Sequence, residues 1–210
     1  MGGSLRAELV SGSADRPSFA VLLPDGWRFD EGDADRFHEE VLSAVEDLPP
    51  DVKRALEPGV RQMVQQAKTA PGSSRVELAG VIRQVEAPED QFVPMSLTVH
   101  WFRPPTGATV QAFGLRMMET REARPLEGSS GVLRWMESAT VASDGESGEF
   151  GGPTYLIPIE GNKHLALLIR TVLPMPEHPD ANMDFVRESL FLLSDSIVTT
   201  LRWKREAVQS

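Results

Sequence analysis

The 210-residue chain contains no cysteine. This absence excludes disulfide bonds, thiolate nucleophiles, cysteine-based zinc sites and iron–sulfur clusters. The sequence also has no apolar run near the roughly 20 residues that span a bilayer, and its N-terminus lacks the apolar core of a signal peptide. We therefore expect a cytoplasmic protein without membrane insertion.

Basic residues are too few and too scattered for a nucleic-acid surface. The chain has 31 acidic and 21 basic residues, which gives a formal net charge of −10. Its longest basic run is Arg202-Trp203-Lys204-Arg205. Because binding to phosphate backbones needs clustered Lys and Arg, we expect no nucleic-acid partner.

The sequence also lacks the motifs of common active sites. Gly128–Gly131 and Gly145–Gly148 do not have the G-x-S-x-G spacing of a nucleophile elbow, and neither phosphate-binding glycine motif occurs. The acidic run at 30–35 fails as a calcium loop, because its sixth and twelfth positions are Asp35 and Val41. No histidine pairs with another at helical spacing. The sequence predicts no catalytic residue, no cofactor and no metal site.

The N-terminal part shows a sharp strand end. Residues 1–17 are small and polar and predict a flexible lead, followed by a single domain over 18–204. A strand is expected at about 18–23. The tripeptide Pro24-Asp25-Gly26 must stop it, since proline presets φ and glycine accepts a positive φ. Trp27 then folds back as an apolar anchor.

Periodicity predicts most of the remaining elements. Helical spacing over 33–48 and 52–67 indicates a helical insertion after the first strand, and a last helix is expected from near Asp180 to about Trp203. Residues 109–121 fit either a strand or a short helix, and 142–153 predict a flexible acidic loop. The expected strands are 76–83, 95–101, 131–138 and a hairpin of 155–159 with 164–173 around Glu160–Lys163.

Two groups of side chains are candidates for ligand contact. Ser96, Thr98 and His100 alternate on one strand face, which is expected either to line a pocket or to pack as an ordinary sheet face. The aromatic and methionine content indicates either an adaptable binding surface or core filling. The candidate binding residues are Trp27, His100, Trp101, Met117, Met118, Trp135 and Trp203.

Two end segments resemble a known family. The run Phe19–Trp27, a strand that leads into Pro-Asp-Gly-Trp, resembles the N-terminal signature of Mog1/PsbP-like domains. The segment from Asp195 to Trp203 after a long strand is also similar. The tail over 155–203 further resembles uncharacterised actinobacterial proteins with a hairpin, a proline-rich link and a helix ending in Leu-Arg-Trp.

The resemblance implies an α+β fold with an antiparallel β-sheet sandwiched by helices. It implies a non-catalytic accessory or adaptor domain that acts through protein–protein contacts, since members of that fold mostly bind or assemble. The partner is expected to be another protein, with a homodimer through the C-terminal helix as a further possibility. The alternative is a small-molecule-binding protein or an unrecognised hydrolase, with a pocket near Ser96, Thr98, His100 and Trp101 gated by 142–153.

Overall fold

Strands dominate the described part of the chain. The computed structural model describes residues 5–10, 16–32, 76–86, 93–143, 146–175 and 181–204. The helices expected over 33–48 and 52–67 lie outside these residues. In chain order the elements are β1 (Leu5–Val10), β2 (Phe19–Pro24), β3 (Trp27–Glu31), β4 (Val76–Gln84), β5 (Ser96–Phe102), α3 (Val110–Arg121), β6 (Arg124–Pro125), β7 (Leu133–Ser143), β8 (Glu146–Pro158), β9 (Ala166–Met175), α4 (Ala181–Thr199) and β10 (Arg202–Trp203).

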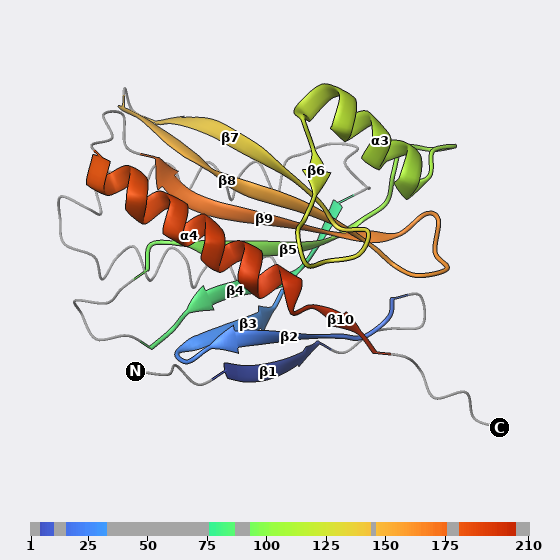
Figure 1. Cartoon of the computed structure of the whole chain (residues 1–210), viewed down its shortest axis with the longest axis horizontal. Helices are drawn as coiled ribbons and strands as arrows, with labels where there is room; N and C mark the ends of the chain where they lie inside the picture. The colour runs from blue at the N-terminus through green and yellow to red at the C-terminus, as the bar shows by residue number, and fades with distance from the viewer. Residues whose placement is uncertain are drawn as a thin grey trace.

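The described strands form two antiparallel sheets (Figure 1). The smaller sheet has the order β1-β2-β10, and the larger one has the order β3-β4-β5-β9-β8-β7-β6. Helix α4 runs across one face of the larger sheet, in front in Figure 1. The expected sheet-dominated α+β class is therefore confirmed for this part of the chain.

The turn after β2 moves the chain from one sheet to the other. Asp25 and Gly26 form the turn, and Gly26 has a φ of 77°. The carbonyl oxygen of Gly26 accepts hydrogen bonds from the backbone N–H groups of Val85 and Glu86, at 2.7 and 3.1 Å. These bonds fix the start of β3 against the end of β4. Trp27 is buried directly after the turn, as the sequence predicts.

Two apolar clusters hold the layers together. The larger cluster fills the space between the larger sheet, the smaller sheet and α4. Phe19 lies at its centre, with edge-to-face contacts to Phe29, Trp101 and Trp203 at centroid distances of 6.0, 6.3 and 5.9 Å. The second cluster lies on the opposite face of the larger sheet, where α3 contributes Phe113 and Met117.

The hairpin of β8 and β9 forms around the turn that the sequence predicts. Strands β8 and β9 flank a turn in which Asn162 N–H donates to the Ile159 carbonyl oxygen at 3.0 Å. Along β9, Leu167 and Ile169 belong to the larger cluster, whereas Ala166 and Leu168 belong to the second one. The nearly continuous apolar run therefore reflects a strand that is buried on both faces. The ambiguous segment 109–121 is the helix α3.

Two expected irregular segments are strands instead. Residues 5–10, expected in a flexible lead, pair with β2 along their whole length. Of the segment 142–153, expected as a loop, residues 142–143 belong to β7 and residues 146–153 belong to β8. The glycines of this segment do not mark a loop, because glycine also allows two backbones to approach closely within a sheet. A Cβ on Gly151 would lie 2.9 Å from the Glu137 carbonyl oxygen.

The C-terminal helix ends earlier than expected. It stops at Thr199, because the Thr200 hydroxyl accepts from the Leu22 N–H at 2.9 Å and donates to the Ile197 carbonyl oxygen at 2.7 Å. The chain then pairs with β2 as β10, opposite Phe19 and Ala20. Trp203 is thus a strand residue, and its indole N–H donates to the Pro158 carbonyl oxygen at 3.1 Å.

Replacement of Gly26 by alanine is expected to destabilise the fold strongly. The new Cβ would overlap the Glu86 carbonyl oxygen, in addition to the strain of a positive φ. Gly161→Ala is the matched control, because Gly161 has a φ of 78° and no atom within 4 Å of the added Cβ. Urea unfolding should show a loss of about 1–2 kcal/mol for the control and clearly more for Gly26→Ala. Equal losses would contradict the proposed role of this turn.

Candidate functional site

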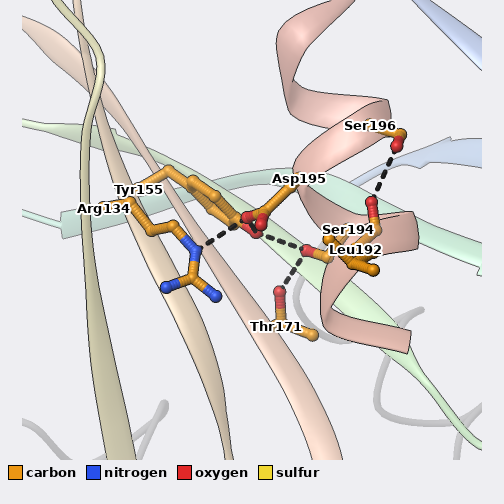
Figure 2. Close-up of polar contacts among 7 residues, drawn as sticks. All are labelled: Arg134, Tyr155, Thr171, Leu192, Ser194, Asp195 and Ser196. Atoms are coloured by element: carbon orange, nitrogen blue, oxygen red, sulfur yellow. Dashed lines mark hydrogen bonds and ion pairs between the residues drawn. The ribbon is translucent and has the colours of Figure 1, made fainter. Parts of the chain in front are cut away.

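A buried polar cluster joins α4 to the larger sheet (Figure 2). The Tyr155 hydroxyl lies 2.6 Å from Asp195 Oδ1 and 2.9 Å from Ser194 Oγ. Arg134 Nε donates to the same Asp195 oxygen at 2.8 Å. Thr171 extends the chain of contacts through its hydroxyl, which bonds to Ser194. Five polar side chains from three strands and one helix therefore meet in an otherwise apolar layer.

Local structure explains why these side chains converge. Arg134 and Tyr155 are direct cross-strand partners on β7 and β8, so both side chains point toward α4. Ser194 is fully buried where α4 crosses the sheet, and an unpaired hydroxyl there would be costly. Adjacent Asp195 is only part-buried and reaches the solvent-facing edge of the contact.

The direction of the hydrogen bonds follows from the charges. Burial, followed by the bond to Asp195, raises the pKa of the Tyr155 phenol well above its usual range, so the phenol stays protonated. Its single hydrogen belongs to the shorter bond, which is the one to the Asp195 carboxylate. We therefore assign the Ser194 hydroxyl as donor to the phenol oxygen and the Thr171 hydroxyl as donor to Ser194.

A hollow of about 520 Å³ opens beside this cluster. The end of α3, strand β6, strand β7 and Asp195 form its walls. Three of the lining side chains are guanidinium groups, and three are carboxylates. The lining residues are Arg121, Glu122, Arg124, Pro125, Leu126, Glu127, Arg134, Trp135, Met136 and Asp195.

Two arginines face each other at this hollow. Arg124 on β6 and Arg134 on β7 are direct cross-strand partners, an arrangement of like charges that is unfavourable by itself. Arg134 uses Nε on Asp195, and Figure 2 shows its terminal nitrogens directed away from that carboxylate. Since Asp195 already occupies Arg134 Nε, the donors left for a further carboxylate are the terminal nitrogens of Arg134 and the Arg124 guanidinium.

The opposite sheet face contains the residues singled out from the sequence. Ser96, Thr98 and His100 share that face, as predicted, and all three are half-buried. Burial, and then the nearby Arg170 charge, lowers the pKa of His100 to about 4. Among the described residues, His100 has no hydrogen bond to a hydroxyl or carboxylate. This geometry does not provide an activated nucleophile.

The other sequence-predicted binding residues are mostly in the core. Trp27, Trp101 and Trp135 are buried, Trp203 and Met117 are half-buried, and Met118 is exposed on α3. Trp101 and Trp203 stack at a centroid distance of 6.4 Å, and the Trp135 indole donates to Glu137 at 2.9 Å. The structure does not bring the seven residues together in one site.

Sequence reasoning missed the residues that do converge. The sequence indicates Tyr155 as a strand residue of the hairpin and Asp195 as part of the end of the last helix, and it suggests no site for either. One feature of the sequence does indicate a polar contact on the last helix: Ser194 and Asp195 interrupt an apolar stretch between Leu193 and Ile197. The cross-strand register that sets Arg134 against Tyr155 and Arg124 was not visible in the sequence.

Comparisons with known proteins give no relative for this chain. No family model, no curated protein and no solved structure matches it. Among the described residues, no helix is long and apolar enough to cross a membrane.

Tyr155→Phe is expected to reduce the free energy of unfolding by about 1–3 kcal/mol, because it leaves Ser194 and Asp195 without the shared hydroxyl. Thr140→Val on the exposed end of β7 is the control, with a change within about 0.5 kcal/mol. Chemical denaturation measures both. A Tyr155→Phe variant as stable as the wild type would show that the cluster contributes little.

His100 should make folding stability depend on pH. Its pKa is near 4 in the folded state and about 6.5 when unfolded, so below pH 6.5 the unfolded chain binds the proton more readily. The neutral His100 therefore costs no free energy of unfolding above pH 6.5, and the free energy of unfolding decreases as the pH falls from 6.5 toward 4. In His100→Gln, the drop in urea midpoint from pH 7 to pH 5 should be smaller than in the wild type. An equal drop would contradict the lowered pKa.

Proposed function

We propose that the chain is a non-catalytic accessory or adaptor domain that acts through protein–protein contacts. One observation carries this proposal: α4 presents four large apolar side chains to solvent, three in its first half and Leu192 further along. Phe185 is 69% exposed, Leu192 65%, Val186 49% and Met183 48%. The sequence pattern predicted Met183 and Val186 on the buried stripe, but among the described residues of α4 the packing against the core begins at Leu190, and Ile197 and Val198 are buried further along.

Two serine hydroxyls beside these side chains are bonded within the helix, and the exposed Glu188 lies between Phe185 and Leu192. The Ser189 hydroxyl donates to the Phe185 carbonyl oxygen at 2.9 Å, and the Ser196 hydroxyl donates to the Leu192 carbonyl oxygen at 2.7 Å. Both hydroxyls are thus bonded within the helix. Phe185 and Leu192 are seven residues apart and therefore share one face of α4, a spacing that is typical of the anchors by which a helix docks another protein.

The alternative function has less support. Small-molecule binding or hydrolysis was expected over Ser96, Thr98, His100 and Trp101. Trp101 faces the larger apolar cluster, away from the other three. The described residues of the segment expected to gate such a pocket, 142–143 and 146–153, belong to strands β7 and β8. We therefore favour a binding domain, and a cytoplasmic location stays a prediction.

We further propose a Mog1/PsbP-like arrangement for the sheet and its helices. The support is the antiparallel sheet with α4 on one face and α3 on the other, together with the Pro-Asp-Gly-Trp turn. The separate sheet of β1, β2 and β10 is a departure from a single sandwiched sheet.

A photo-crosslinking amino acid at Phe185 or Leu192 tests the proposed function in the native cell. We expect adducts with one or a few proteins at both positions, because both side chains face solvent on the same helix. Leu115, 55% exposed on α3, is the matched control and should give far weaker adducts. Mass spectrometry identifies the products.

Each outcome separates the alternatives. Adducts with other proteins at 185 and 192 support an adaptor, whereas adducts only with a second copy of this chain indicate a homodimer through α4. Equal labelling at Leu115, or none at any position, contradicts the proposal.

A further inference from the structure

Strand β7 has a long outer edge. Along its other side it pairs with β8 at every residue from Leu133 to Ser143. On the outer side, within the described part of the chain, it pairs only with β6, at Leu133 and Arg134. Figure 1 shows β7 along the upper border of the larger sheet, with the short β6 beside one end.

The register identifies which backbone groups point outward. The Leu126 N–H donates to the Val132 carbonyl oxygen at 2.9 Å, which sets Val132 facing β6. N–H and C=O groups of alternate residues point to the same side of a strand. No bulge interrupts the pairing of β7 with β8. Met136, Ser138, Thr140 and Ala142 therefore direct their backbone groups away from β8, along the row that β6 begins.

This edge lacks the usual protection against pairing. Natural edge strands commonly have lysine, proline or a bulge. Residues 133–143 contain neither lysine nor proline. Met136, Ser138, Ala139 and Thr140 are exposed, so both faces of the strand are open there. The edge is suited to accept one more strand.

A strand added to the outer edge of β7 would end at the hollow beside β6. Met136 borders the hollow, and so do the facing arginines Arg124 and Arg134. Among the described residues, neither Arg121 nor Arg124 forms an ion pair. Glu122, Glu127 and Asp195 also line the hollow, and Arg134 Nε already pairs with Asp195 at 2.8 Å, so the hollow is not a basic patch, and the groups left for a further carboxylate are Arg124 and the terminal nitrogens of Arg134.

We propose that the outer edge of β7, from Met136 to Ala142, binds an extended segment of a partner protein as an added strand. An acidic residue of that segment pairs with Arg124 and with the terminal nitrogens of Arg134, whose Nε is bonded to Asp195. Backbone hydrogen bonds supply affinity, and the carboxylate sets the register. This inference rests on the proposed function, because it names the chemistry of a partner, but it concerns a different surface from the exposed apolar side chains of α4.

Selection from a phage-displayed library of short random peptides on the full chain tests the inference. We expect selected peptides to combine a run of β-branched residues with one Asp or Glu. Fluorescence anisotropy with a dye-labelled selected peptide then measures the affinity for variants.

Two matched sets of variants separate the edge from the arginines. Ser138→Pro removes an outward N–H and leaves the pairing with β8, whereas Ser138→Ala keeps that N–H. Binding should weaken by about tenfold or more in Ser138→Pro and in Arg124→Glu, and should not change in Ser138→Ala. Selection repeated on Arg124→Glu should replace the acidic residue by Lys or Arg. Circular dichroism melting confirms that each variant is folded.

Several results would overturn the inference. These are failure to select any peptide, peptides without an acidic residue, and equal binding to folded Ser138→Pro. Dimerisation of the wild type that Ser138→Pro abolishes would assign the edge to a second copy. If crosslinks at Phe185 and Leu192 persist in any of these cases, the proposed function stands and only the β7 edge is excluded.

Discussion

Burial of β9 on both faces is the constraint on which the rest of the structure depends. Leu167 and Ile169 face α4 and the smaller sheet, while Ala166 and Leu168 face α3. A strand without a solvent face needs a layer on each side. The neighbouring strands β5 and β8 then supply the hydrogen bonds that this buried backbone requires.

The polar cluster at Tyr155 lies within this apolar layer. A phenol, two hydroxyls and a carboxylate are tolerated there because each one bonds to another. The cluster holds the second half of α4 against β8 and β9. Before Leu190, Met183, Phe185 and Val186 are exposed. One helix therefore combines a part that is anchored to the sheet with exposed apolar side chains.

The candidate surfaces could be predicted only in part. Alternation along 95–101 correctly placed Ser96, Thr98 and His100 on one face. The binding role suggested for the tryptophans found no common site, because Trp27, Trp101 and Trp135 lie in the core. The arginine pair could not be predicted, since Arg124 and Arg134 meet only when β6 folds back on β7.

Local chemistry determined the elements that the sequence shows clearly. The turn at Pro24-Asp25-Gly26, the hairpin around Glu160–Lys163 and the helix before Thr199 follow from backbone preference and apolar periodicity over a few residues. Tertiary structure decided the strand pairing of 5–10, the strands over 142–143 and 146–153, and the partial covering of α4. The reason is that these depend on which surfaces meet across large sequence separations, and hydrogen bonding between distant strands leaves no periodic signal in either strand alone.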